Sequence, residues 1–173
     1  LTSLSKPQPR KGLELAGLFL RRLLTRNMSL ELLKETFAWA RECRPSQPLT
    51  SCVWFADRAL NRYVLAESDI ITFHNYKPLP NLQKQIAELK ADGRPLVCTE
   101  YMARTDGSCF DTHLPLFKKE QVGCYNWGLV AGKTQTYFSW KSQRGSGEPG
   151  HWFHDILRPD GTPYRQEEVD LIR

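Results

Sequence analysis

Residues 69–101 read DIITFHNYKPLPNLQKQIAELKADGRPLVCTEY, and their pattern determines the architecture that we expect for the chain. The apolar runs at 69–76 and 94–100 have the composition of buried strands. Between them, residues 81–91 carry leucine and isoleucine at helical spacing, and Gly93 follows as a helix-ending residue. A strand, a helix and a second apolar strand together predict a parallel βαβ unit.

The same alternation extends to both sides of this unit. Parallel sheets are covered by helices, so the pattern predicts an α/β protein. Two architectures fit it, a doubly wound open sheet and a (β/α)8 barrel. No G-x-G-x-x-G or P-loop motif follows an expected strand, which argues against the nucleotide-binding folds. The other expected elements are helices at 29–41, 58–66 and 166–172, a short helix within 108–119, and strands at 49–55 and 122–130.

Polar or aromatic residues end every expected strand. A carboxylate directly after an apolar strand is costly unless it is solvated, paired or used, and Glu100 is such a residue. Barrel enzymes place catalytic groups at this end of their strands, so the pattern favours the barrel and predicts one shared cleft. The strand-end residues are Trp54, His74, Asn75, Tyr76, Glu100, Tyr101, Asn126 and Trp127.

A shared cleft would combine these side chains in a way that suits glycoside chemistry. Glu100 would lie beside His74 and Tyr76, with Trp127 beneath them. A carboxylate can attack or stabilise the anomeric carbon of an oxocarbenium-like transition state, and an indole ring can hold the apolar face of a sugar. Each residue also has a structural explanation by itself: Glu100 can pair with Arg104, and Trp127 can belong to the core.

Trp54 and Asn126 are further expected substrate-binding residues. Trp54 can line a subsite or pack against the helix that follows it, and Asn126 can hold a sugar hydroxyl or bond to the backbone. The stretch HWFH at 151–154 can roof the cleft or pack locally, and local packing is the favoured explanation. No spacing of histidine, aspartate and glutamate indicates a metal site.

Three motifs in this order resemble a known family. They are FHNY (73–76), CTEY (98–101) and YNWG (125–128). The flanking phrases EYMAR (100–104), NWGLVAGKTQTYFSW (126–140) and FHDILRPDGTPY (153–164) share the likeness. From residue 29 to 173 the sequence resembles the C-terminal half of a retaining β-glycoside hydrolase of the large (β/α)8 clan. That clan contains cellulases, β-mannanases, xylanases and β-galactosidases, and the catalytic barrels of families 5 and 2 are the most similar in style.

The resemblance implies a fold and a set of roles. The fold would be a partial (β/α)8 barrel of about the last four βα units. Glu100 would be the nucleophile, and His74 and Tyr76 would position it. Trp127 would be the sugar platform, and the substrate would be a β-linked oligo- or polysaccharide. The family implies no cofactor and no metal, and a parent protein that is secreted or periplasmic.

The sequence departs from the family pattern upstream of the expected barrel half. The family places its general acid/base glutamate in an Asn-Glu pair at the end of the fourth strand, and residues 3–28 contain no such pair. Glu14 is the only acid there, within a Leu/Arg-rich helical pattern. We therefore expect residues 1–28 to be an atypical helical segment that precedes a truncated and impaired hydrolase at 29–173. The alternative is a non-catalytic carbohydrate-binding remnant. Open barrel edges would also favour self-association.

Charge and composition limit the other functions. The formal net charge of +5 permits nucleic-acid contact, but the lysines and arginines are scattered among acids rather than gathered on one face. The apolar segment 13–24 is interrupted by charges and is shorter than the roughly 20 residues that span a bilayer. It also lacks the pattern of a signal peptide, and a first residue other than Met is expected of a fragment or a processed start.

The five cysteines are odd in number and form no C-x-x-C pair. The sequence therefore predicts neither a zinc site nor a disulfide framework. Cys98 and Cys124 lie in apolar strands, where cysteine usually acts as a small hydrophobic residue. A cysteine nucleophile activated by a histidine remains an alternative.

Overall fold

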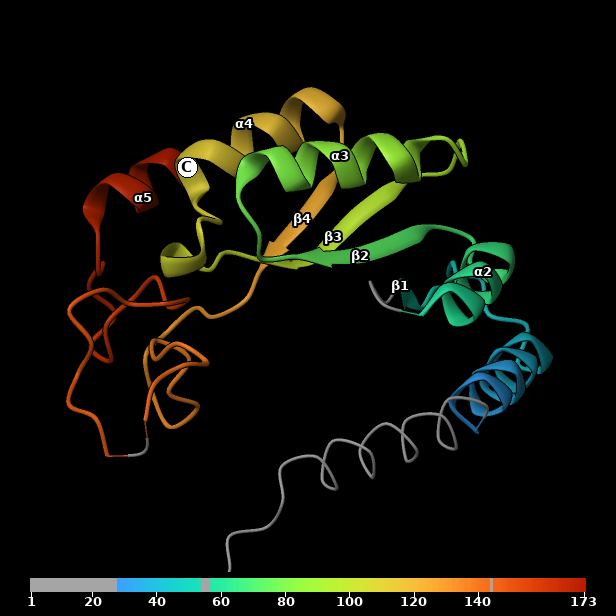
Figure 1. The fold of residues 1–173 in the computed structure, drawn as a ribbon, viewed down its shortest axis with the longest axis horizontal. Coiled ribbons are helices and arrows are strands. Elements are labelled where there is room, and N and C mark those ends of the chain that lie inside the picture. Colours follow the sequence, from blue (N-terminus) through green and yellow to red (C-terminus); the bar gives the residue numbers. More distant parts are fainter. Residues whose placement is uncertain (1–27, 54–56, 144) are drawn as a thin grey trace, which may run out of the picture.

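The structure of the chain is a computed structural model, and it describes residues 28–53, 57–143 and 145–173. Four strands of the described chain form one parallel sheet in the order β1-β2-β3-β4 (Figure 1). The protein is therefore an α/β protein, as the sequence predicts. The strands are β1 (Cys52–Val53), β2 (Ile71–Asn75), β3 (Leu96–Tyr101) and β4 (Gly123–Asn126).

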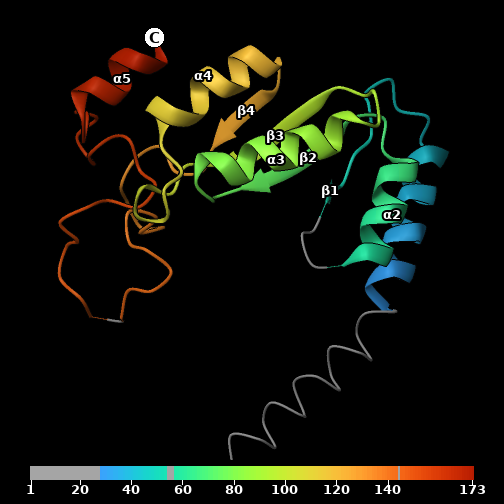
Figure 2. The same cartoon turned by 45° about the horizontal axis from the view of Figure 1, so that its top comes forward.

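Helices connect successive strands of the sheet. In Figures 1 and 2, α3 and α4 lie over the same face, and α5 lies beside α4. Strand neighbours in the sequence are also neighbours in the sheet, without the reversal that marks a doubly wound fold. This topology is compatible with successive units of a barrel. The helices are residues 28–42, α2 (Arg58–Glu67), α3 (Leu79–Lys90), the 3-10 turn η1 (Arg104–Asp106), α4 (Phe110–Glu120) and α5 (Gln166–Ile172).

Local chemistry explains where several helices begin and end. The Asp57 carboxylate accepts hydrogen bonds from the backbone N–H groups of Ala59 and Leu60, both at 3.1 Å, and so caps the start of α2. Gln121 ends α4 in the left-handed conformation with a φ of 53°. Within the described ranges, no helix has both the length and the apolar character required to cross a bilayer.

The expected strands are shorter in the structure. The expected strand at 49–55 is seen as the two residues of β1, and Trp54 lies outside the described residues, as does nearly all of the expected segment 1–28. The expected strand at 122–130 ends at Asn126 because Gly128 has a φ of +85°, which an extended strand cannot adopt.

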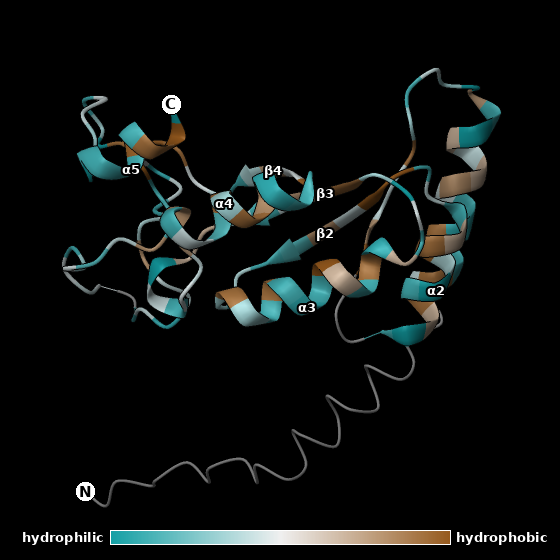
Figure 3. Ribbon diagram, turned by 90° about the horizontal axis from the view of Figure 1, so that it is seen from above, coloured by the Kyte–Doolittle hydropathy of each residue, from teal (hydrophilic) through white to brown (hydrophobic). Residues whose placement is uncertain are grey.

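The apolar core lies between the sheet and the two helices α3 and α4. Each of its large side chains stabilises the fold by about 1.5–3 kcal/mol through burial. Figure 3 shows that β2 changes from hydrophobic to hydrophilic toward its arrowhead, so the apolar core does not extend along β2 to its carboxyl end. Its main members are Ile71, Phe73, Leu82, Ile86, Leu89, Leu96, Cys98, Tyr101, Phe110 and Phe117.

A bulge in β3 decides which way Glu100 points. Phe73 pairs with Cys98, but the next residue of β2, His74, pairs with Glu100, so Thr99 is one extra residue in β3. Cys98 and Tyr101 both belong to the core on the helix side. Simple alternation from Cys98 would place Glu100 in that core as well. The extra residue instead directs Glu100 to the opposite face, beside His74.

The long loop 127–165 gathers beyond the carboxyl ends of the strands (Figures 1 and 2). Arg104 attaches this loop to β3 and α5. Its guanidinium donates to the Glu168 carboxylate through Nε at 2.8 Å and Nη2 at 2.5 Å, and to the carbonyls of Trp152 and Asp155, both at 3.1 Å. The Arg104 side chain is only 4% exposed, so this is a buried ion pair with its donors satisfied.

Candidate active site

Three side chains meet at the carboxyl ends of β2 and β3, and we call them the Glu100 centre. Tyr76 Oη donates a hydrogen bond to Glu100 Oε2 at 2.7 Å. His74 Nδ1 lies 3.2 Å from the same oxygen. The side chains of His74 and Glu100 are 32% and 26% exposed, so the carboxylate is partly shielded but open to a ligand. The three residues that the sequence places together are therefore in direct contact.

The direction of the hydrogen bond within the Glu100 centre follows from the acidity of Tyr76. Burial, and next the hydrogen bond to Glu100, raise the pKa of Tyr76 well above its usual value. The phenol therefore keeps its proton at neutral pH and donates it toward the carboxylate. A carboxylate with one oxygen held in this way is oriented for attack through its other oxygen.

An aromatic wall of Tyr76, Trp140, Phe153 and His154 stands beside the Glu100 centre. The Tyr76 ring lies 5.0 Å from the Trp140 ring at 89°, and 5.4 Å from the His154 ring. Trp140 also meets Phe153 edge-on at 4.7 Å. Such edge-to-face pairs stabilise beyond simple burial by about 0.5–1.5 kcal/mol each. The loop 127–165 thus supplies three of the four rings of the wall.

Backbone strain occurs two residues after Glu100. Met102 is fully buried and has a φ of 80°, which is uncommon for a residue other than glycine. Its N–H donates to Ser108 Oγ at 3.1 Å, and its carbonyl accepts from His154 Nδ1. Burial lowers the pKa of His154, which keeps the ring neutral with its proton on Nδ1. Strain of this kind is often found at functional sites.

Trp127 and Asn126 follow the end of β4. The N–H of Trp127 donates to the Tyr101 carbonyl at 3.0 Å, and its side chain is 46% exposed. The Asn126 amide donates to the Gly128 carbonyl at 2.6 Å, so it is bonded to the backbone of its own turn. In the described chain no ring contact joins Trp127 to Tyr76 or His74. Both residues lie at the expected strand end, without direct contact to the Glu100 centre.

Gly128 allows a close approach of the turn to the loop. A Cβ at this position would lie 2.7 Å from Asp155 Oδ1 and 2.8 Å from the His154 Cβ. Asp155 is fully buried, and its Oδ1 accepts from Thr136 Oγ1 at 2.7 Å, whereas its Oδ2 has no partner among the described residues. Close packing of the turn against His154 and Asp155 therefore requires a glycine at position 128, the last residue of the YNWG motif.

The remaining sequence candidates have other positions. Arg104 binds Glu168 rather than Glu100, so the simple ion-pair explanation of Glu100 is not what the structure has. Within HWFH, Trp152 is buried and stacks on Tyr164 with a centroid distance of 4.5 Å, which is local packing, whereas the His154 ring lies 5.4 Å from the Tyr76 ring, beside the Glu100 centre. His151 is exposed. Trp54 lies outside the described residues.

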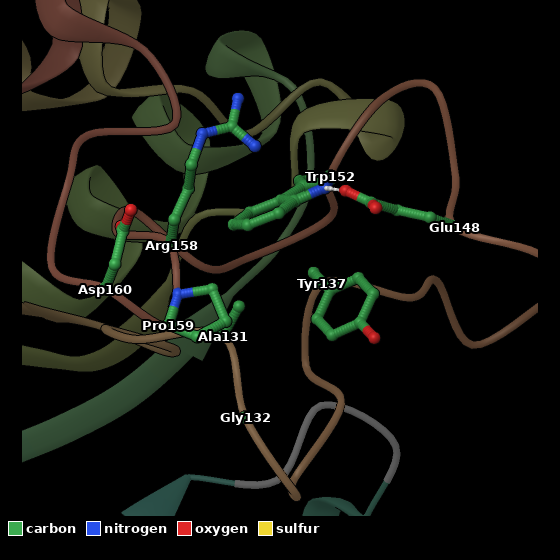
Figure 4. A pocket seen from close by; sticks show the side chains of 8 residues that line it. All are labelled: Ala131, Gly132, Tyr137, Glu148, Trp152, Arg158, Pro159 and Asp160. Carbon is green, nitrogen blue, oxygen red and sulfur yellow. Dashed lines mark hydrogen bonds between the residues drawn. The ribbon is translucent and has the colours of Figure 1, made fainter.

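A pocket of about 370 Å³ lies within the loop, apart from the Glu100 centre (Figure 4). Its polar side chains are engaged locally. Glu148 accepts from Trp152 Nε1 at 2.9 Å, the Arg158 guanidinium lies over the Trp152 ring, and Asp160 accepts from Thr162. The lining residues are Ala131, Gly132, Tyr137, Glu148, Trp152, Arg158, Pro159 and Asp160.

Metal and thiol chemistry find little support in the described residues. No group of three or more histidine, cysteine, aspartate or glutamate side chains in that part of the chain could hold a metal ion. All five cysteines are free. Burial raises the pKa of Cys98 to about 12 and that of Cys52 to about 11, so both thiols stay protonated and weakly nucleophilic.

Sequence reasoning missed Trp140, Met102 and Ser108. Trp140 stands in the stretch TYFSWKS at 136–142, and three aromatic residues close together among polar ones are a signal that could have been noticed. Nothing in the sequence indicates that Met102 has a positive φ or that Ser108 accepts its N–H, because both depend on tertiary contacts.

Comparison with known proteins found no match, neither among protein-family models nor among curated proteins. The likeness to β-glycoside hydrolases therefore rests on the motifs of the sequence. The contacts of the Glu100 centre are the structural basis for assigning a function.

Proposed function

We propose that Glu100 is the nucleophile of a retaining β-glycosidase centre that acts on β-linked oligo- or polysaccharides. The observation that carries this proposal is the contact of Glu100 Oε2 with Tyr76 Oη at 2.7 Å and with His74 Nδ1 at 3.2 Å. The bulge in β3 supports it, because it directs a carboxylate out of the core at the expense of regular strand pairing. Exposed tryptophans near the same strand ends suit a sugar.

Each residue of the Glu100 centre has its own role in this reaction. The free oxygen of Glu100 attacks the anomeric carbon, the glycosidic bond breaks, and its electron pair leaves with the departing group. A glycosyl ester forms, and water later hydrolyses it. Tyr76 holds the carboxylate in position and stabilises its charge before attack and again when the ester is cleaved. His74 fixes the same oxygen from the neighbouring strand.

The fold that we propose for this centre is a segment of a (β/α)8 barrel. Sequential parallel strands, helices on one face and chemistry at the carboxyl ends are the features of such a barrel. In a retaining enzyme a second carboxyl group lies about 5–5.5 Å from the nucleophile. The Asn-Glu pair in which the resembled family carries that group does not occur in residues 3–28. We therefore expect slow turnover of natural glycosides, whose leaving groups must be protonated.

A test of the proposal uses substrates whose leaving group needs no proton. Dinitrophenyl β-glycosides with fluorine at carbon two of the sugar allow the ester to form and slow its hydrolysis. We expect the intact protein to gain one fluoroglycosyl group, and peptide mapping to place it on Glu100. Glu100→Gln should abolish labelling, whereas Glu88→Gln, a change at an exposed carboxylate of α3, should not.

Two results would overturn the assignment of Glu100. One is the absence of any adduct with the gluco, xylo, manno and galacto reagents. The other is equal labelling of the Glu100→Gln variant. Saturable binding of oligosaccharides without any adduct would instead support the second candidate, a non-catalytic carbohydrate-binding domain. The lack of an Asn-Glu pair in residues 3–28 favours this candidate.

A further inference from the structure

We propose that Trp140 is the platform of a second sugar subsite, next to the one whose anomeric carbon meets Glu100. It would take a pyranose ring of a β-linked gluco- or xylo-oligosaccharide. This inference rests on the proposed function for its ligand class, but its geometry is independent of the chemistry at Glu100. Trp140 ends one of the phrases that share the family likeness, but the sequence alone assigns it no role.

Trp140 combines high exposure with firm anchoring. Its side chain belongs to a residue that is 62% exposed, yet its ring meets Tyr76, Phe153 and His154 at centroid distances of 5.0, 4.7 and 5.6 Å. Interplanar angles of 89°, 82° and 61° show that these contacts are edge-to-face. The residue is thus held by three rings and still more than half exposed, which is the combination that a stacking platform requires.

The anchoring rings connect Trp140 to the Glu100 centre. Tyr76 touches the Trp140 ring with its own ring and holds Glu100 with its hydroxyl. His154 and Phe153 are 2% and 1% exposed, so they are fixed supports rather than mobile neighbours. A sugar stacked on the exposed part of Trp140 would therefore lie close to the Glu100 carboxylate, because Tyr76 contacts both residues.

The backbone on either side of Trp140 is held as well. The N–H of Ser142 donates to the Ser139 carbonyl at 3.0 Å, which closes a turn around the tryptophan. Lys141 Nζ lies 3.3 Å from Asp106 Oδ1 on η1, directly after β3. The Lys141 side chain is 83% exposed, so this ion pair adds little, and the turn and the three ring contacts are the main constraints on Trp140.

The other described tryptophans are less suited to this role. Trp152 is 3% exposed and covered by Tyr164, so its face is closed to a ligand. Trp39 is 55% exposed but lies on the helix 28–42, in the part of the chain that precedes the sheet. Trp127 is 46% exposed and sits at the end of β4, which leaves it available for the neighbouring subsite.

The chemistry of stacking selects the sugar class. An indole face binds the C–H groups of a pyranose ring. β-Linked glucose and xylose have only equatorial hydroxyls, so both faces of their rings present C–H groups. Cello- and xylo-oligosaccharides can therefore stack through either face, whereas the axial hydroxyl of galactose restricts stacking to one face.

The first experiment uses the unmodified protein. N-Bromosuccinimide oxidises exposed indoles, and mass spectrometry locates the oxidised residues. We expect xylotetraose or cellotetraose to protect Trp140 by more than fivefold in rate while Trp39, which is of similar exposure, reacts unchanged. Equal reaction of Trp140 with and without saturating oligosaccharide would overturn the proposal.

The second experiment measures affinity by calorimetry. Trp140→Ala should weaken binding of the preferred tetrasaccharide at least tenfold, Trp140→Phe should weaken it less, and Trp39→Ala should have no effect. Unchanged affinity in folded Trp140→Ala would also overturn the proposal, with folding checked by circular dichroism. If Glu100 is labelled in the unmodified protein but Trp140 proves irrelevant, only this inference fails. If Trp140-dependent binding occurs without labelling of Glu100, the hydrolase proposal fails and the subsite stands.

Discussion

Tyr76 Oη donates to Glu100 Oε2 at 2.7 Å and thereby joins the ends of two neighbouring strands, β2 and β3. The pair exists because the extra residue in β3 directs Glu100 to the face on which His74 lies. A raised pKa keeps the Tyr76 proton in place. The contact is thus a product of strand register and burial together, and it explains how a charge directly after an apolar strand is accommodated.

Removal of the Tyr76 hydroxyl should slow the covalent step. Tyr76→Phe keeps the ring contact with Trp140 but removes the hydrogen bond from the phenol to Glu100 Oε2. We therefore expect labelling by the dinitrophenyl reagents to slow by about a hundredfold. Stopped labelling reactions followed by intact-protein mass spectrometry give the rate. Tyr125→Phe, at an exposed residue of β4, is the matched control. A rate that Tyr76→Phe leaves unchanged would contradict the role assigned to this hydroxyl.

Loss of the buried ion pair between Arg104 and Glu168 should destabilise the loop and α5. Glu168→Ala leaves a guanidinium buried without its carboxylate, so the free energy of unfolding should fall by about 3–5 kcal/mol. Urea unfolding followed by tryptophan fluorescence measures it. Glu167→Ala, its exposed neighbour on α5, should change the value by less than about 0.5 kcal/mol. Similar values for the two variants would contradict the prediction.

Acidification should destabilise the fold through two buried histidines. Burial lowers the pKa of His113 and His154 below the ordinary 6.5. Below about pH 6.5 the unfolded chain therefore binds protons that the folded chain does not, and stability falls until the pH drops below the folded pKa values. Unfolding free energies measured across this range should decrease with falling pH. His154→Gln should reduce the slope, and an unchanged slope would show that this histidine titrates normally.

The open edge of the sheet should promote self-association. In the described chain, β4 pairs with β3 and lies at the end of the sheet, and three large side chains on β4 or directly after it are exposed, Tyr125, Leu129 and Val130. Unpaired strand edges with exposed apolar residues recruit further strands. Light scattering should show a mass that rises with concentration.

A charged variant tests this edge directly. Tyr125→Lys combined with Leu129→Lys should restore the monomer, because charge on an edge strand disfavours pairing. Leu171→Lys, at a similarly exposed position on α5, is the control and should still associate. A monomer at every concentration in the unmodified protein would contradict the prediction.

Local patterns were sufficient for the order of the elements. Alternating apolar runs and helical spacing predicted the βαβ units, and the parallel sheet has that order. The placement of polar residues at strand ends predicted the contact of Glu100 with Tyr76 and His74. The order of the elements depends on neighbours in the sequence, and parallel strands end at one edge of a sheet, so periodicity and composition were enough to expect these residues near one another.

Register and long-range partners needed the folded chain. The period-two alternation of β3 would have buried Glu100, and only pairing with β2 shows that Thr99 is the extra residue. Arg104 finds Glu168, and Trp140 reaches Tyr76, each across about sixty residues of sequence, which no local pattern encodes. The sequence alone thus specifies the strand, the carboxylate at its end and the types of residue expected beside it. Packing between distant segments then selects the face of the sheet on which that carboxylate lies and the aromatic ring beside it.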